Sequence, residues 1–134
     1  MKLIDIYNSL KENYKSEIIF LKSGTFIVTF NEDAYIIKDL FNYQIKNNKV
    51  GYPKKALNKV ENKLKEENIN YIFYEDGNVV ENLLDNNKYH SFKSESKKNE
   101  FNNQMKTLLI DRITYLINES EDNYDKIRRF IDEF

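Results

Sequence analysis

The pattern of apolar and polar positions is clearest over residues 51–76, where it predicts a turn, a helix, a second turn and a strand. Gly51 and Pro53 mark the first turn, and Pro53 suits the start of a helix because it lacks an N–H. Asn68 is expected to end the helix, since Asn tolerates left-handed backbone. Residues 69–74 are β-branched and aromatic, as in a buried strand. The apolar face of the helix consists of Ala56, Leu57, Val60 and Leu64.

The N-terminal segment predicts a helix followed by a β-hairpin. Apolar residues recur at helical spacing over residues 2–15, and residues 17–21 form a short apolar run typical of a central strand. Residues 22–24, Lys-Ser-Gly, predict a tight turn, and residues 25–30 predict a second strand. These two strands are therefore expected to pair as a hairpin.

A second helix is expected from about Ala34 to Asn42. Asn31 is predicted to cap it with its side chain, and Glu32 and Asp33 lie favourably at the positive end of the helix dipole. A helix that returns to a strand needs a sheet on which to pack. The predicted fold is thus α/β (α+β), a mixed β-sheet flanked by helices.

The remaining pattern divides the chain into three parts. Residues 1–84 are expected to form the α/β core, with a polar connection over 45–55 and a short edge strand beginning at Val79. Residues 85–100 are polar and charged, and predict a loop or linker. Residues 101–134 predict amphipathic helices that pack on the core or on a partner, including a second copy. The last helix has a seam with 3-4-3 spacing: Tyr124, Ile127, Ile131 and Phe134.

Charge and composition narrow the function classes. The chain has 21 Lys and Arg against 22 Asp and Glu, a net charge of −1, so any nucleic-acid contact must come from a local basic patch. There is no cysteine, which excludes disulfides and thiolate chemistry. No apolar run has membrane-spanning length, and the N-terminus lacks a signal-peptide core. We expect a cytoplasmic protein without membrane contact.

Candidate catalytic chemistry is sparse. His90 is the single histidine and falls in the polar segment, with no cysteine or second histidine to share a metal. Helix capping accounts for the adjacent carboxylates Glu32 and Asp33. With three glycines, the chain has no phosphate-cradling loop. We therefore expect a protein that is not an enzyme and that needs no metal or cofactor.

Two ungapped blocks, residues 14–34 and 51–76, together resemble the N-terminal domain of the MutS family of DNA mismatch repair proteins, the domain that contacts the mismatch. The resemblance covers about residues 3–77, and Asn68 stands where the family has Gly. The matching residues are Gly24, Phe26, Phe30, Glu32, Asp33 and Ala34 in the first block, and Gly51, Pro53, Ala56, Lys63, Leu64 and Glu75 in the second.

The resemblance implies a stand-alone mismatch-recognition-like domain without the family's ATPase, clamp and lever domains. In bacterial members a Phe-x-Glu motif reads the mismatch: the Phe wedges into the base stack and the Glu hydrogen-bonds a base. Here the triplet is Phe26-Ile27-Val28, so the wedge is kept and the polar contact is lost. The family's basic connection before Gly51 is also shorter in this chain.

Two functions follow from these observations. In the first, the domain associates with double-stranded DNA, Phe26 is the wedge, and Lys22, Lys46, Lys49, Lys54 and Lys55 contact phosphates. In the second, the fold is kept as a scaffold without DNA binding, those lysines are an ordinary solvated face, and the C-terminal helices mediate homodimer or protein-partner contacts.

Overall fold

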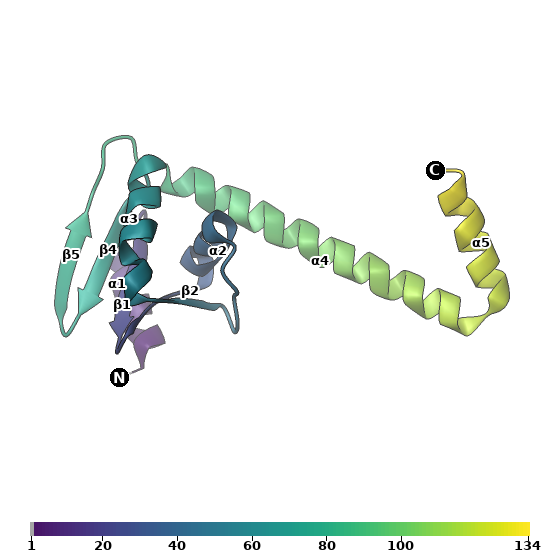
Figure 1. Cartoon of the computed structure of the whole chain (residues 1–134), viewed down its shortest axis with the longest axis horizontal. Coiled ribbons are helices and arrows are strands. Elements are labelled where there is room, and N and C mark those ends of the chain that lie inside the picture. The colour runs from purple at the N-terminus through teal and green to yellow at the C-terminus, as the bar shows by residue number, and fades with distance from the viewer. Residues whose placement is uncertain (1) are drawn as a thin grey trace. The chain divides into compact units, whose positions relative to one another are not determined.

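The computed structural model describes residues 2–134, and the chain divides into two compact units, one ending at Lys97 and the other running from Lys98 to Phe134. We call them the core unit and the helical unit. The core unit is built on a five-stranded sheet of order β3-β2-β1-β4-β5 (Figure 1). Strand β1 pairs in parallel with β4, and the other neighbours are antiparallel. The expected mixed sheet flanked by helices is confirmed.

The helices and strands follow one another closely along the core unit. β1 is the central strand, as its short apolar run predicts, and the helix expected before it ends at Asn13. The elements in chain order are α1 (Leu3–Asn13), β1 (Ile18–Ser23), β2 (Phe26–Phe30), α2 (Asn31–Phe41), β3 (Lys49–Pro53), the 3-10 turn η1 (Lys54–Ala56), α3 (Leu57–Glu66), β4 (Tyr71–Glu75), β5 (Asn78–Asn82) and the start of α4 (Tyr89–Glu119).

Helices cover both faces of the sheet. Apolar residues of α1 pack with Ile19, Leu21 and Val28 on one face. The other face carries Ile18, Phe20 and residues of α2, α3 and the first turn of α4. Because side chains alternate along β1 and β2, these strands contribute residues to two separate apolar clusters, one on each face of the sheet.

Asparagine closes several of the turns. Among residues 2–134, six of the seven non-glycine residues with positive φ are asparagines, including Asn42 at +58° after α2 and Asn68 at +56° after α3. The prediction that Asn68 ends its helix in left-handed backbone is confirmed. The predicted β1–β2 hairpin is also confirmed, and Gly24, with φ of +61°, lies in its turn. The turn consists of residues 24 and 25 rather than the predicted 22–24, because Lys22 and Ser23 are paired within β1.

Two details of residues 31–55 differ from expectation. The α2 cap position is Phe30, no side chain caps the helix, and Asn31 is itself its first residue, so the predicted Asn31 cap is wrong. The polar connection over 45–55 contains strand β3, whose Val50 and Tyr52 are buried against the core. Its other residues, Lys49, Gly51 and Pro53, are poor strand formers, so the sequence did not indicate a strand with alternating buried and exposed residues.

The predicted polar loop over residues 85–100 is wrong from Tyr89 onward, because α4 begins there. Tyr89 is buried, and the Ser96 hydroxyl donates to the Asp39 carboxylate at 2.9 Å. Lys93 and Lys97 pair with Glu32 of α2 at 3.1 and 3.6 Å. These contacts attach the start of α4 to the core unit, which therefore extends to Lys97 rather than to residue 84.

The helical unit contains the rest of α4 and α5 (Glu121–Asp132). Ser120 separates the helices and caps α5, since its hydroxyl accepts a 3.1 Å hydrogen bond from the Asn123 N–H. The side-chain amide of Asn123 donates to the Leu116 carbonyl at 2.9 Å. The C-terminal helices expected over residues 101–134 are therefore present, and Ser120 separates them.

Candidate functional site

The aromatic ring predicted as a wedge lies at the end of the β1–β2 hairpin. Phe26 is the first residue of β2, opposite Ser23 on one side and Pro53 on the other. Its side chain is 50% exposed, and neither of the two apolar clusters includes it. The N–H of Lys54 donates to the Thr25 carbonyl at 2.9 Å, which holds the hairpin turn against the start of η1. Phe26 is thus a large apolar side chain that the core does not use.

Three of the predicted lysines lie at this end of the sheet. Lys22 forms a 2.7 Å ion pair with Glu75, and Lys22 and Lys54 line the same shallow surface pocket of about 440 Å³. The hydrogen bond to Glu75 raises the pKa of Lys22, and contact with the Lys22 ammonium lowers the pKa of Lys54. Lys55 follows in η1 and is exposed. Asp76 also lines this pocket, so this end of the sheet carries three lysines and the two carboxylates of Glu75 and Asp76.

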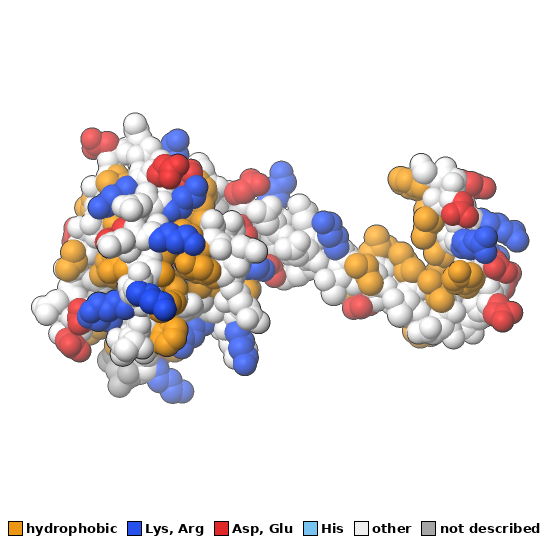
Figure 2. Space-filling model, in the orientation of Figure 1, with side chains coloured by type: hydrophobic (Ala, Val, Ile, Leu, Met, Phe, Trp, Pro, Cys, Tyr) orange, Lys and Arg blue, Asp and Glu red, His pale blue; other side chains and the backbone are white. Residues whose placement is uncertain are grey.

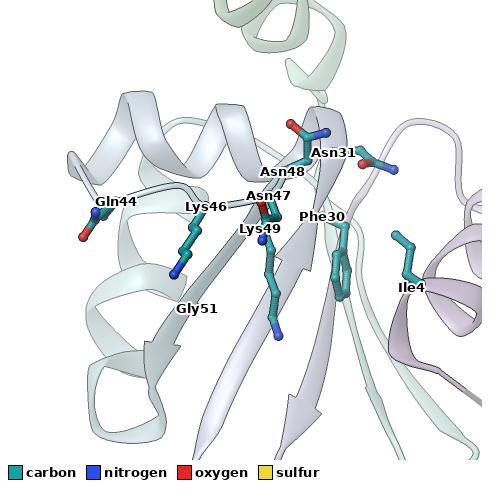
Figure 3. A pocket seen from close by; sticks show the side chains of 9 residues that line it. All are labelled: Ile4, Phe30, Asn31, Gln44, Lys46, Asn47, Asn48, Lys49 and Gly51. Atoms are coloured by element: carbon teal, nitrogen blue, oxygen red, sulfur yellow. The ribbon is translucent and has the colours of Figure 1, made fainter.

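The other two lysines lie at the opposite end of β3. Lys46 and Lys49 exchange backbone hydrogen bonds and line an open pocket of about 810 Å³, which we call the lysine pocket (Figure 3). The Lys49 ammonium lies 5.8 Å from the centre of the Phe30 ring. No acidic residue lines this pocket; besides Ile4, Phe30 and Gly51, its lining consists of amides and the two lysines, namely Asn31, Gln44, Lys46, Asn47, Asn48 and Lys49.

The structure therefore divides the predicted lysines into two groups. Lys49 is paired with Phe30 and Pro53 with Phe26, so the two ends lie four residue steps apart along the extended strand. At about 3.3 Å per residue, this distance is roughly 13 Å. Phe26, Phe30 and Lys49 alternate onto one face of the sheet, the face that α1 partly covers. Lys22 differs from them, because it lies on the central strand β1, where it is paired with Ile27, and therefore points to the other face of the sheet.

Val28 stands between the two ends and does not reach solvent. Its side chain is 4% exposed and packs in the cluster beneath α1. Gly51 lies opposite it, and a Cβ added at Gly51 would come within 3.3 Å of a Val28 methyl group. Where the resemblance places the base-contacting Glu of Phe-x-Glu, this chain has a packed aliphatic side chain.

The comparisons with known proteins agree with this geometry. The model of the MutS domain I family matches residues 2–71, which is more than half of the chain. The chain belongs to the MutS domain I family. A search of curated proteins found no match. The match to MutS domain I spans α1 to the start of β4, and therefore includes Phe26 and all five candidate lysines.

A buried carboxylate, which the sequence assigned to helix capping, is the centre of a polar cluster in this MutS domain I chain. Asp33 is fully buried and accepts hydrogen bonds from the Tyr7 hydroxyl at 2.9 Å, the Tyr89 hydroxyl at 2.6 Å and the Ile19 N–H at 3.1 Å. The Lys11 ammonium lies 3.0 Å from each carboxylate oxygen. The pattern could not show this cluster, because its members are spread from residue 7 to residue 89.

Burial controls the ionisation of this cluster. Burial raises the pKa of Asp33, and the opposing effects of Lys11, Tyr89 and the Ile19 N–H do not outweigh it. Burial lowers the pKa of Lys11 and raises that of Tyr89, which the adjacent Asp33 charge raises further. Every member is held by a fixed partner inside the fold, so the cluster joins α1, β1, α2 and α4 rather than presenting a group to solvent.

The remaining features considered from the sequence are His90, a metal site and a membrane-spanning helix. His90 lies in the first turn of α4, where one ring nitrogen is 2.8 Å from the Ser16 hydroxyl. Among residues 2–134, no group of three or more His, Asp or Glu side chains is placed to hold a metal ion. Over the same residues, no helix combines the length and apolar composition needed to cross a membrane.

Proposed function

We propose that this MutS domain I chain is a non-enzymatic module that binds distorted double-stranded DNA, such as a mismatched or bulged duplex. Phe26 enters the base stack at the distortion, and the two lysine groups contact phosphates on either side. Family membership supports this proposal, and the observation that carries it is the half-exposed ring of Phe26 at the end of a tight, well-anchored hairpin.

The hairpin supplies what an inserting side chain needs. An apolar wedge must unstack a base step at a cost of a few kcal/mol, so it is effective only when its own backbone is fixed. Phe26 meets this condition, because β2 is paired on both sides and its turn is bonded to Lys54. The ring is half exposed and belongs to neither apolar cluster of the core unit.

Charge makes the lysine pocket the stronger of the two phosphate contacts. Glu75 and Asp76 partly offset Lys22, Lys54 and Lys55 beside the hairpin, whereas Lys46 and Lys49 are surrounded by amides, which also hydrogen-bond phosphate oxygens. Such contacts position a duplex without reading its sequence. Up to five phosphate contacts give binding that weakens steeply as salt is added.

The buried Val28 shapes the expected specificity. A valine side chain cannot hydrogen-bond a base, so recognition rests on the ease of unstacking and bending. We therefore expect preference for the most easily distorted sites, such as bulges and unstable mismatches, with little discrimination by base identity.

The proposal is tested by fluorescence anisotropy with a labelled bulged duplex and its matched duplex. Wild type is expected to prefer the bulged duplex, and Phe26→Ala is expected to lose about tenfold or more in affinity, equivalent to about 1.4 kcal/mol. Val80→Ala is the matched control, because Val80 is an equally exposed apolar residue on β5, at the other edge of the sheet. Equal affinity of wild type and Phe26→Ala for the bulged duplex would show that Phe26 does not act as a wedge.

The phosphate contacts have a separate test. Lys46→Gln with Lys49→Gln should reduce the slope of log affinity against log salt by about two, with similar losses on both duplexes. Lys59→Gln with Lys65→Gln is the control, since both residues are exposed on α3, which packs on the opposite face of the sheet. An unchanged salt slope in the first pair would show that the lysine pocket does not contact DNA.

A further inference from the structure

The helical unit has no core of its own. None of residues 98–134, all of which the structure describes, is buried. Figure 2 shows apolar side chains gathered on α4 and α5 within this unit. The large apolar residues that are exposed there are Phe101, Met105, Leu108, Leu109, Ile110, Tyr115, Tyr124, Phe130, Ile131 and Phe134.

The short helix α5 has little stability of its own. Isolated helices shorter than about 12–15 residues are marginal in water, and α5 has 12 residues. Yet the Ser120 cap and the Asn123 bond to Leu116 give the turn between α4 and α5 a defined geometry. The turn between the helices is well defined, but the apolar side chains of both helices are uncovered. We infer that another surface packs against them.

The exposed apolar area is large enough for a stable interface. A large apolar side chain offers on the order of 150–200 Å². Ile110 lies on the other side of α4, one turn from Thr107, and the remaining nine residues, which are about half to fully exposed, present on the order of 1,000 Å². A standard stable interface buries about 800 Å² on each partner. Patches of this size on soluble proteins mark interaction sites.

We propose that this apolar face packs against the same face of a second copy of the chain, with the two α5 helices antiparallel. The α5 seam of Tyr124, Ile127, Ile131 and Phe134 has the 3-4-3 spacing of a coiled coil. Glu121 and Arg128 are one heptad apart on the same flank of this seam. Like flanks meet in an antiparallel pair, so Glu121 of each copy lies beside Arg128 of the other, in both halves of the interface.

The charge of the helical unit argues against nucleic acid and anionic membranes as the covering surface. Residues 98–134 carry eight acidic and six basic side chains, which disfavours nucleic acid and anionic membranes as the covering surface. The near balance of charge leaves little repulsion between two copies, and antiparallel helices also oppose their dipoles. An isologous, closed pair uses each apolar face once and leaves none free.

Sedimentation velocity of the full chain over a wide concentration range tests the pairing. Wild type is expected to sediment with the mass of two chains, and Leu109→Glu is expected to weaken association at least tenfold. Thr107→Glu, which adds the same charge on the opposite side of α4, should remain dimeric. A wild-type chain that is monomeric throughout, or a Leu109→Glu chain that dimerises like wild type, would overturn the proposal.

A charge exchange tests the partner and the direction together, and does not depend on the folding of Leu109→Glu. Glu121→Arg and Arg128→Glu should each weaken self-association, because each places like charges opposite one another. An equimolar mixture of the two variants should recover dimers, since both contacts then become attractive. Failure of the mixture to associate better than either variant alone would overturn the antiparallel pair. This inference is independent of DNA binding by the core unit.

Discussion

The hydroxyl of Tyr89 donates a 2.6 Å hydrogen bond to Oδ1 of Asp33, which joins the first turn of α4 to the buried start of α2. The same hydroxyl accepts from the Lys11 ammonium at 2.9 Å, so three separate helices meet at one oxygen. The matched family region ends at residue 71, well before Tyr89. The bond therefore attaches a segment beyond the family match to the centre of the domain.

Loss of this hydroxyl should destabilise the core unit. Tyr89→Phe keeps the buried ring but removes one hydrogen-bond partner from the Asp33 carboxylate and one from the Lys11 ammonium. Because hydrogen bonds to charged groups contribute about 1.5–3 kcal/mol, we expect the free energy of unfolding to fall by about 2 kcal/mol. Urea denaturation measures this change. Tyr115→Phe, at an exposed position of α4, is the control and should be nearly neutral.

The attachment of α4 should also depend on pH through Glu32. Burial alone would raise the pKa of Glu32, but the hydrogen bond from Lys93 and the charges of Lys93, Lys97 and Lys11 hold it below the usual 4.5. A lowered carboxyl pKa contributes stability that is present above the ordinary value and is lost as pH falls through the lowered one.

Glu32→Gln should therefore cost stability near neutral pH and progressively less in acid. The difference in free energy of unfolding between wild type and Glu32→Gln is expected to shrink as the pH falls from about 6 to about 3. Glu95→Gln, which removes an exposed acid of α4, is the control. A difference that stays constant over this range would show that the Lys93 and Lys97 pairs contribute nothing.

Restoring the family's Phe-x-Glu triplet should not restore base recognition. Val28→Glu places a carboxylate among the apolar side chains of the cluster beneath α1. We expect a loss of about 2–3 kcal/mol in the free energy of unfolding, measured by thermal and urea denaturation. Val80→Glu, on exposed β5, should change stability by less than about 0.5 kcal/mol. A stable Val28→Glu chain would mean that the side chain can turn outward.

The left-handed asparagine after α3 should tolerate glycine but not alanine. Left-handed backbone costs roughly 1–2 kcal/mol for a residue that has a Cβ but no polar side chain. Asn68→Ala should therefore lower the free energy of unfolding by about 1 kcal/mol. Asn68→Gly should stay within about 0.5 kcal/mol of wild type. Asn62→Ala, at an exposed position within α3, serves as the control in the same denaturation series.

The sequence predicted the parts of the fold in which local pattern and packing agree. The β1–β2 hairpin, α3, its Asn68 stop and β4 all combine strong periodicity with clear turn residues. Strand β3 was missed because only Val50 and Tyr52 face the core, and Gly51 and Pro53 are typical of turns. The start of α4 was missed for a similar reason, since Tyr89 and Phe92 are its only apolar residues before Phe101.

The sequence could name candidate residues for a site but could not show how they are arranged. The exposed position of Phe26 followed from its place beside a glycine turn. Sequence neighbours suggested that Lys46, Lys49, Lys54 and Lys55 form one cluster, but β3 is extended and carries them to opposite ends. The Asp33 cluster depends on contacts between residues far apart in the chain, which no local pattern encodes.

The asparagines that close the turns have a consequence for the unfolded chain. Glycine in such places lets the denatured polypeptide sample many more conformations, all of which folding must give up. Asparagine reaches the same left-handed backbone while keeping a Cβ, so the denatured ensemble is narrower. A chain with three glycines thereby forms its sharp turns at a smaller entropic cost than a glycine-rich relative of the same shape.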